Sequence, residues 1–436
     1  MEISIKEPKE YERVIEITLP PDEVKKKIDS LYQKYQTTLH INGFRKGKIP
    51  PHIIKSKFGD SIKEEAVNDT IRETYREVVK NEKLSPITQG IITDTKFSDE
   101  AGLSFKVAFE VIPDIKPKNY KGIEVEKLPT AVNEKEIDTA LSKLQASKAT
   151  YIPSPIRRAS PGDMVIVDYE ILHEEKGIIR KNRVSNYSIL LDGEGVPKEF
   201  TQGLTNSMPG DRRKVSFRYP MDFKDENLKG KWVEYEFLVR EVKEKKLPKI
   251  DDEFAKDIGF NSLQKLKQQI EKEIKKEKER VSKSKIWTQI INSLISLHPF
   301  SPPTAIVNAY LRPMLEKVGN KIDRETKKNL EEIAIWRAKR EILLDQIAEL
   351  EDIKLTDDEI KSKLLETEES EKMDYENSVK ALKKAGIFEP LVEEFRREKV
   401  LDFLANCAKI GGYNVSSNSG SKENFSSIYY KGRENM

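Results

Sequence analysis

The sequence predicts a multidomain α+β protein with a mixed N-terminal α+β domain, an antiparallel β domain and an all-α C-terminal domain. Three observations lead to this prediction. The spacing of apolar residues changes twice along the chain, prolines gather at the changes, and 436 residues exceed the ~100–200 residues of one domain. We expect domains at 1–112, 161–246 and 247–411, an extended connector at 113–160 and a disordered tail at 412–436.

Residues 1–112 combine the patterns of strands and helices. Residues 11–19 alternate like a strand, and Pro20-Pro21-Asp22 then opens a helix, because proline and acidic residues are favoured in a first turn. The apolar stripe of that helix consists of Val24, Ile28, Leu31, Tyr35 and Leu39. A second long helix is expected after Gly59-Asp60. Two strand-like runs, at 87–97 and 103–112, predict a hairpin.

Residues 162–243 change to the period of two that is typical of strands. The alternating residues are Val165, Val167, Tyr169 and Ile171 in one run and Val233, Tyr235, Phe237 and Val239 in another. Turn signals between the two runs, such as Met208-Pro209-Gly210-Asp211, separate further short strands. This pattern predicts a compact β-rich domain.

After Leu247-Pro248 the chain has helical periodicity to about residue 411. The lysine-rich segment 262–285 is expected to expose a solvated helix face. Cys407 lies on the last apolar stripe, where we expect a small core residue. Further helices are expected at 324–350, 356–368, 373–385 and 387–410.

Composition excludes several classes of function. Lys and Arg number 78 and Asp and Glu 75, so the net charge is +3. The protein as a whole is therefore neither strongly basic nor strongly acidic. The single cysteine, Cys407, allows no internal disulfide and fits a reducing cytoplasm. The four histidines lack metal-ligand spacing, so we expect no metal and no cofactor. No stretch approaches the ~18 apolar residues of a membrane span, and we expect no membrane contact.

The most distinctive segment of the sequence is Gly43-Phe44-Arg45-Lys46-Gly47-Lys48-Ile49-Pro50. Residues 40–59 hold five Lys or Arg and no acidic residue. An aromatic side chain beside clustered cations suits docking onto a surface of RNA and protein. A solvated basic turn, with Phe44 in its own core, explains the same residues. Composition leaves both interpretations open.

This segment resembles the ribosome-docking signature of the bacterial trigger factor family. Similarity to that family continues in the same order at 66–79, 121–127, 226–231 and 302–307, and covers about residues 1–410. The resemblance implies contact with the ribosome beside the exit tunnel, through a ribosomal protein and adjacent rRNA. The implied contact residues are Gly43, Phe44, Arg45, Lys46, Gly47 and Lys48.

The β-rich domain resembles a peptidyl-prolyl isomerase of the FKBP type. Such an enzyme needs no nucleophile or metal, because an apolar pocket can favour the twisted imide over the planar one. The pocket residues implied by the resemblance are Tyr169, Ile179, Tyr187, Val196, Pro197, Phe200, Phe223 and Tyr235. Alternating aromatic residues in a small β domain are also what an ordinary core requires.

Three pocket positions depart from the family pattern. Pro197 stands where a backbone N–H would hold a substrate carbonyl, Arg180 where the family has an acid, and Phe223 where it has a tyrosine. These departures predict reduced isomerase activity.

The resemblance implies an ATP-independent, ribosome-associated chaperone of the cytoplasm. Its C-terminal helices would form arms that hold nascent and unfolded chains through exposed apolar patches, assisting folding and export, with a role in cell division. A monomer–dimer equilibrium is left open. The alternatives are a non-enzymatic RNA-binding protein that uses the basic loop, and a coiled-coil scaffold. Near-zero net charge argues against the first, and prolines at 299–303 argue against the second.

Overall fold

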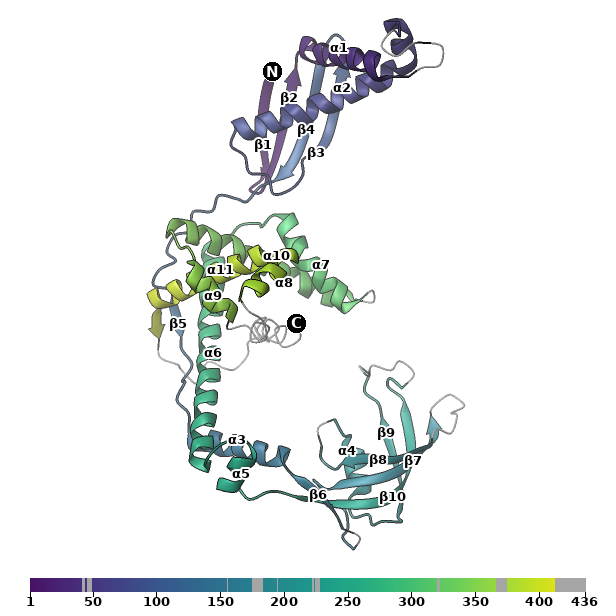
Figure 1. Cartoon of the computed structure of the whole chain (residues 1–436), viewed down its shortest axis with the longest axis vertical. Helices are drawn as coiled ribbons and strands as arrows, with labels where there is room; N and C mark the ends of the chain where they lie inside the picture. The colour runs from purple at the N-terminus through teal and green to yellow at the C-terminus, as the bar shows by residue number, and fades with distance from the viewer. Residues whose placement is uncertain are drawn as a thin grey trace. The chain divides into compact units, whose positions relative to one another are not determined.

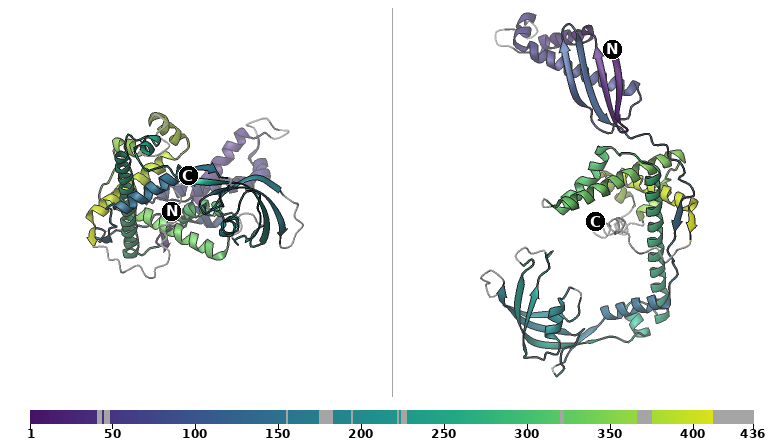
Figure 2. Two further views of the ribbon diagram at one scale, coloured as in Figure 1. Left: turned by 90° about the horizontal axis from the view of Figure 1, so that it is seen from below. Right: turned by 180° about the vertical axis from the view of Figure 1, so that it is seen from behind.

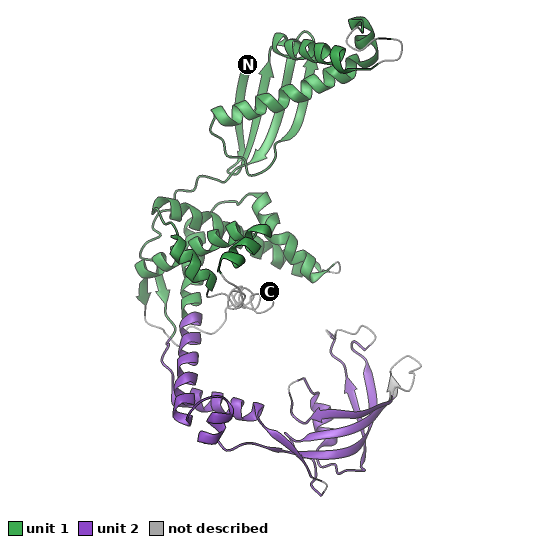
Figure 3. Cartoon of the chain, viewed as in Figure 1, with its two compact units in different colours: residues 1–128, 282–436 green, residues 129–281 purple. Residues whose placement is uncertain are grey.

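The structure is a computed structural model of the chain (Figure 1). It describes residues 1–40, 44, 49–154, 156–174, 183–193, 195–221, 223, 228–319, 322–365 and 375–411. The chain divides into two compact units, residues 1–128 with 282–436 and residues 129–281 (Figure 3). The predicted α+β fold class is confirmed, and the tail predicted at 412–436 lies outside the described residues.

The N-terminal part of the first unit is a four-stranded antiparallel sheet in the order β1-β2-β4-β3. Its strands are β1 (Glu2–Lys9), β2 (Glu12–Leu19), β3 (Ile91–Ser98) and β4 (Gly102–Glu110). Helices α1 (Pro21–Thr38) and α2 (Pro51–Asn81) lie on one face, as Figures 1 and 2 show from opposite sides. The predicted stripe of α1 packs into this core, with Val24, Ile28 and Leu31 buried.

The second helix begins earlier than predicted. It starts at Pro51 rather than after Gly59, because Pro50 has an extended backbone (φ −61°, ψ 136°) and Pro51 suits a first helical turn. Glycine usually weakens a helix, but Gly59 faces α1, where an added Cβ would lie 3.4 Å from the Tyr32 hydroxyl. Close packing of the two helices therefore overrides the local preference of glycine.

The hairpin predicted from the sequence is confirmed as β3 and β4, which pair in an antiparallel register. Gly102 begins β4 with a φ of +85°, and a Cβ there would lie 2.1 Å from the backbone oxygen of Leu19. Only glycine fits this position.

The helical part of the first unit surrounds a core made mainly by α6, α8 and α11. Its helices are the C-terminal half of α6 (Leu263–Leu297), α7 (Thr304–Val318), α8 (Arg324–Leu350), α9 (Asp357–Leu365), α10 (Tyr375–Lys384) and α11 (Phe388–Cys407). Strand β5 (Glu124–Glu126) pairs in parallel with β11 (Lys409–Gly411) beside this core. Cys407 is only partly buried, because it stands in the last turn of α11.

The second unit is built on a five-stranded antiparallel sheet in the order β6-β10-β7-β8, with β9 also paired to β10. The strands are β6 (Thr150–Pro153), β7 (Met164–Glu174), β8 (Arg183–Leu190), β9 (Arg212–Arg218) and β10 (Trp232–Lys246). Helix α4 (Lys198–Leu204) packs on this sheet through the buried Leu204. The predicted β-rich domain is thus a sheet whose long strand β10 contacts three others.

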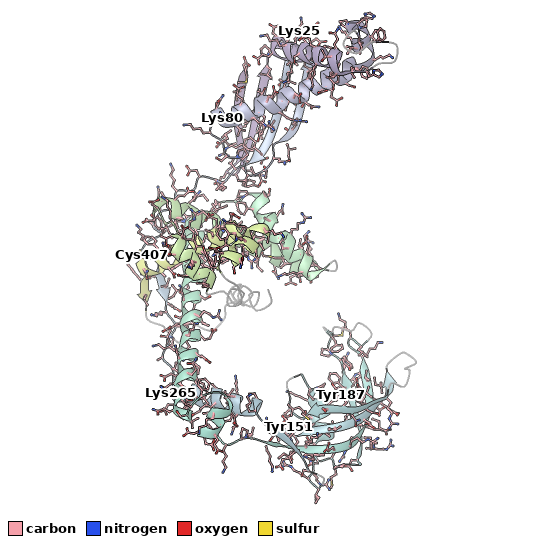
Figure 4. All side chains as sticks on the ribbon, viewed as in Figure 1. Lys25, Lys80, Tyr151, Tyr187, Lys265 and Cys407 are labelled. Atoms are coloured by element: carbon pink, nitrogen blue, oxygen red, sulfur yellow. The ribbon has the colours of Figure 1, made fainter. Side chains whose placement is uncertain are left out.

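A smaller helical core belongs to the same unit. Helices α3 (Glu134–Ser147) and α5 (Asp252–Asp257) pack on the N-terminal half of α6 through Leu141, Phe254 and Leu266. The lysine-rich face of α6 is exposed as expected, for example at Lys265 (Figure 4). Lys278 is an exception, since it donates to Glu136 in the capped first turn of α3.

Candidate functional site

Eight aromatic side chains meet on the sheet of the second unit. Neighbouring rings lie with centroids 4.6 to 5.9 Å apart, mostly edge to face, which is the favoured arrangement of aromatic pairs. We call this group the aromatic cluster; its members are Tyr169, Tyr187, Phe200, Phe217, Tyr219, Phe223, Tyr235 and Phe237.

The cluster has a buried base and an exposed rim. Phe237 and Tyr235 alternate on β10 and are 1% and 6% exposed, and the ring of Phe200 on α4 packs within 5.2 Å of both. Tyr187 on β8 is 50% exposed and Phe223 is 38% exposed. An apolar segment of another chain could therefore reach the rim without unfolding the base.

Phenol groups supply the polar atoms of the cluster. The hydroxyl oxygens of Tyr219 and Tyr235 lie 2.6 Å apart, a short hydrogen bond. Burial raises the pKa of the Tyr169 phenol, and the nearby phenols of Tyr187 and Tyr219 raise it further. The cluster thus combines four phenols, two of them hydrogen-bonded to each other, with four phenylalanine rings.

The structure brings together most of the pocket residues predicted from the sequence. Tyr169, Tyr187, Phe200 and Tyr235 contact one another through their rings, and Phe223 joins them through Tyr219, 4.6 Å away. Val196 packs against the same core. Ile179 and Arg180 lie outside the described residues.

The segment before α4 presents no spare backbone donor at the two predicted positions. Pro197 has no N–H, and its carbonyl oxygen accepts from the N–H of Phe200 at 3.0 Å. The N–H of Val196 donates to the carbonyl of Gly193 at 3.1 Å. A ligand carbonyl at this place would have to find its donor elsewhere in the cluster.

Three members of the cluster, Phe217, Tyr219 and Phe237, were not among the predicted pocket residues. Phe217 lies on β9 and Tyr219 directly after it, at the period of two that continues from Val215. Their alternation was the available signal, but alternation fits core packing equally well. The hydrogen bond of Tyr219 to Tyr235, a predicted pocket residue on β10, places Tyr219 in the same group of side chains.

A buried carboxylate fixes the strands that carry the cluster. Asp168 precedes Tyr169 on β7, is 5% exposed, and accepts hydrogen bonds from Arg240 on β10 and from the N–H of Asn186 on β8. These bonds, first those from Arg240, lower the pKa of Asp168 from 3.8 to about 2. Three strands are thereby held in register directly beside Tyr169.

The predicted docking segment is described only in part. Phe44 is 36% exposed, while Gly43 and Arg45, Lys46, Gly47 and Lys48 lie outside the described residues. The end of the segment is anchored, since Ile49 is fully buried in the N-terminal core and its carbonyl accepts from Gln36 on α1. Phe44 is therefore partly open to solvent, and the docking role of the segment stays a prediction.

Models of known families match three stretches of the chain. A model described as the bacterial trigger factor protein matches residues 1–144, and a model of the C-terminus of that protein matches residues 262–406. The chain belongs to the trigger factor family. Between these two matches, a model of the FKBP-type peptidyl-prolyl cis-trans isomerase matches residues 156–243, which include the whole aromatic cluster.

Trigger factors of other bacteria align with this chain over most of both lengths. The trigger factor of Koribacter versatilis is 28% identical over 408 residues, covering 90% of this chain and 93% of the relative. That of Desulfotalea psychrophila is 29% identical over 420 residues, covering 93% and 95%. A solved structure, reported for promiscuous substrate recognition in folding and assembly by the trigger factor chaperone, matches with a TM-score of 0.54 and 22% identity. It covers 93% of this chain and 99% of its own, and supports the fold.

The trigger factor C-terminal region holds a buried ionic network between α8 and α11. Arg397 is 9% exposed and donates to Asp345 at 2.8 Å and to Glu341 at 2.9 Å. Glu341 also accepts from the hydroxyl of Tyr310 on α7, whose pKa is raised by burial and by this bond. The network joins three helices of the region.

Large apolar side chains remain exposed on the helices of this region. Residues of this kind lie on or at the ends of α7, α8, α9 and α11, and include Val318, Ile335, Leu350, Leu365 and Ile387. Within the described residues, no helix has the length and apolar character needed to cross a membrane.

Proposed function

We propose that this chain is an ATP-independent, ribosome-associated chaperone of the cytoplasm that also isomerises prolyl peptide bonds. In this proposal residues 1–112 dock on the ribosome, residues 161–246 act as the isomerase, and residues 247–411 hold nascent and unfolded chains. The observation that carries the isomerase assignment is the aromatic cluster, with a buried base and an exposed rim inside the FKBP-matched segment.

The cluster suits prolyl isomerisation for a simple chemical reason. Rotation about an X–Pro bond breaks amide conjugation, which gives a barrier of roughly 20 kcal/mol. The twisted imide is less polar than the planar one, so an apolar aromatic site binds the twisted form better and lowers the barrier. Phe200, Tyr235 and Phe237 provide that surface.

The polar side of the site supports a reduced rate. Pro197 has no N–H, the N–H of Val196 already donates to the carbonyl of Gly193, and Phe223 has no hydroxyl. A binding site with few polar groups holds its substrate in a less defined orientation. We therefore propose activity well below that of an isomerase with all three donors.

Ribosome docking is assigned to Gly43–Lys48, through a ribosomal protein and adjacent rRNA. The exposure of Phe44 and the absence of acidic residues from 40 to 59 support this assignment. Phe44 would supply an apolar anchor, while Arg45 and Lys46 would pair with phosphates or carboxylates.

The holding function is assigned to the helical region because its large apolar side chains are exposed. Exposed apolar surface binds unfolded chains without nucleotide, since burial of apolar area alone is favourable. Assistance to folding and export follows from holding chains in an open state.

One set of three assays on the full chain tests the proposal. We expect co-sedimentation with ribosomes, suppression of aggregation of an unfolded protein without ATP or RNA, and protease-free isomerisation of an X–Pro peptide. Phe200→Leu should lower the isomerisation rate at least tenfold, whereas Phe254→Leu, in the separate helical core of the same unit, should not. A chain that binds RNA but fails to suppress aggregation would support the RNA-binding alternative instead.

A further inference from the structure

The hydroxyl pair of Tyr219 and Tyr235 lies where the aromatic cluster passes from its base to its rim. Tyr235 is 6% exposed, whereas Tyr219 is partly exposed and its ring touches Phe223, which is 38% exposed. The two oxygens are 2.6 Å apart. A polar contact held at this boundary can meet a ligand that enters from the rim.

We propose that the Tyr219 hydroxyl donates a hydrogen bond to a carbonyl oxygen of the bound X–Pro segment, oriented by Tyr235. This assignment rests on the proposed isomerase function. Phe217 and Phe223 hold the Tyr219 ring on two sides, with centroids 4.9 and 4.6 Å away. A hydroxyl can accept from one partner while it donates to another, so the bond to Tyr235 can persist when substrate binds.

Several other polar groups of the cluster suit this role less well. Tyr187 is 50% exposed, so a bond from its hydroxyl would replace a bond to water with little net gain. Val196 uses its N–H within a turn, and Pro197 and Phe223 have no donor to offer there. Tyr235 is 6% exposed and packs edge to face against the rings of Tyr169 and Phe200 at the buried base, so Tyr219 is the member of the pair nearer to the rim.

The chemistry of the reaction selects which carbonyl accepts the bond. A donor on the oxygen of the rotating imide would strengthen conjugation across the C–N bond and raise the barrier. A donor on the next carbonyl, that of the proline itself, leaves the rotating bond unaffected and fixes the ring over the apolar base. We therefore assign the carbonyl of proline as the acceptor.

The test compares full-length variants in a protease-free isomerisation assay with a Leu-Pro tetrapeptide. Tyr219→Phe should lower kcat/KM roughly fivefold, the usual effect of one lost hydrogen bond, and Tyr235→Phe should lower it less. Tyr151→Phe removes a phenol from β6 of the same sheet, outside the cluster, and should leave the rate unchanged (Figure 4). Unfolding in urea checks that each variant is folded.

A second peptide separates a substrate contact from a purely structural role. When sulfur replaces the oxygen of the proline carbonyl, the acceptor becomes weak. The wild-type rate, relative to the uncatalysed rate, should then fall roughly fivefold. On this second peptide the Tyr219→Phe variant should have the same rate as wild type. This measurement on the wild-type chain stands even if Tyr219→Phe does not fold.

The outcomes are distinguishable. An inactive wild-type chain would overturn the proposed isomerase function together with this assignment. An active chain in which Tyr219→Phe keeps the full rate, or in which Tyr235→Phe alone loses it, would overturn only the role of Tyr219. Equal wild-type rates on the two peptides would also overturn only the role of Tyr219.

Discussion

Arg240 on β10 donates two hydrogen bonds to one oxygen of the Asp168 carboxylate on β7, from Nε at 2.9 Å and from Nη2 at 2.5 Å. The other oxygen accepts from the N–H of Asn186 on β8 at 3.0 Å. One carboxylate therefore ties β7 to β10 and to β8, the two strands that pair with it. Its charge state should affect the whole domain.

The stability of the β domain should fall in acid because of Asp168. Its pKa is lowered from 3.8 to about 2 in the folded chain, mainly by Arg240. A lowered pKa stabilises the fold fully above the ordinary value, and this stabilisation is lost as the pH falls from about 4 towards 2. The Asp168→Asn variant should have a lower free energy of unfolding than wild type at pH 7. This difference in free energy should shrink as the pH falls from about 4 towards 2.

Urea unfolding at pH 7, 5, 4, 3 and 2 measures this difference. Asp138→Asn, on the exposed face of α3, is the matched control and should follow wild type throughout. A stability difference between wild type and Asp168→Asn that stays constant down to pH 2 would contradict the role given to the ionised carboxylate.

Removal of the docking tip should abolish ribosome binding. Replacing Phe44, Arg45 and Lys46 by Ala removes one apolar anchor and two cations. Each charge-assisted contact is worth roughly 1.5–3 kcal/mol, which predicts at least tenfold weaker binding. The control Lys25→Ala/Lys26→Ala removes the same charge from exposed positions of α1. Co-sedimentation measures both, and equal loss in the control would point to general charge rather than docking.

A hydroxyl at residue 223 should raise isomerase activity. The ring of Phe223 lies 4.6 Å from that of Tyr219 and is 38% exposed, so the new hydroxyl would reach the rim without disturbing the base. One added hydrogen bond is worth ~1 kcal/mol, so Phe223→Tyr should increase kcat/KM by about fivefold. The protease-free assay measures it; a rate at or below that of wild type would show that residue 223 does not face the substrate.

Loss of Arg397 should destabilise the helical region strongly. Arg397→Ala leaves Asp345 and Glu341 without their buried partner, and breaking a buried ion pair on one side costs about 3–5 kcal/mol. Arg397→Lys keeps the charge but loses the forked geometry and should cost less. Urea unfolding, followed by circular dichroism of the helices, gives both values. Equal stability of the two variants and wild type would mean that the network contributes nothing.

Local patterns were sufficient to predict most elements. The 3–4 spacing of Val24, Ile28 and Leu31 predicted α1, and the alternation of Tyr235 and Phe237 predicted β10, because each element buries one face. The predicted start of α2 was wrong, since the packing of the helix on α1 at Gly59 overrides the usual effect of glycine in a helix. That contact depends on a residue 27 positions away, Tyr32, which no local window includes.

The site was predictable only as a set of aromatic residues. Tyr169, Phe200 and Tyr235 were assigned by resemblance, and their contacts bring them into one group. The pairing of Tyr219 with Tyr235 could not be predicted, because it depends on the register of β9 against β10. The same holds for Arg240 and Asp168, which face each other only once a bulge near Val239 shifts β10 against β7.

The parallel pairing of β5 with β11 determines when each part of the chain can be finished during synthesis. The strands and core residues of the N-terminal sheet and its two helices all lie within residues 2–111, so the segment assigned to docking can fold while the rest is still being made. Val125, in contrast, stays without its partner Ile410 until residue 410 of the 436 has been synthesised. Bringing such distant segments together is slow, because the entropy of closing the long intervening loop must be lost first. A nascent chain would thus carry a finished N-terminal sheet before its helical part is complete.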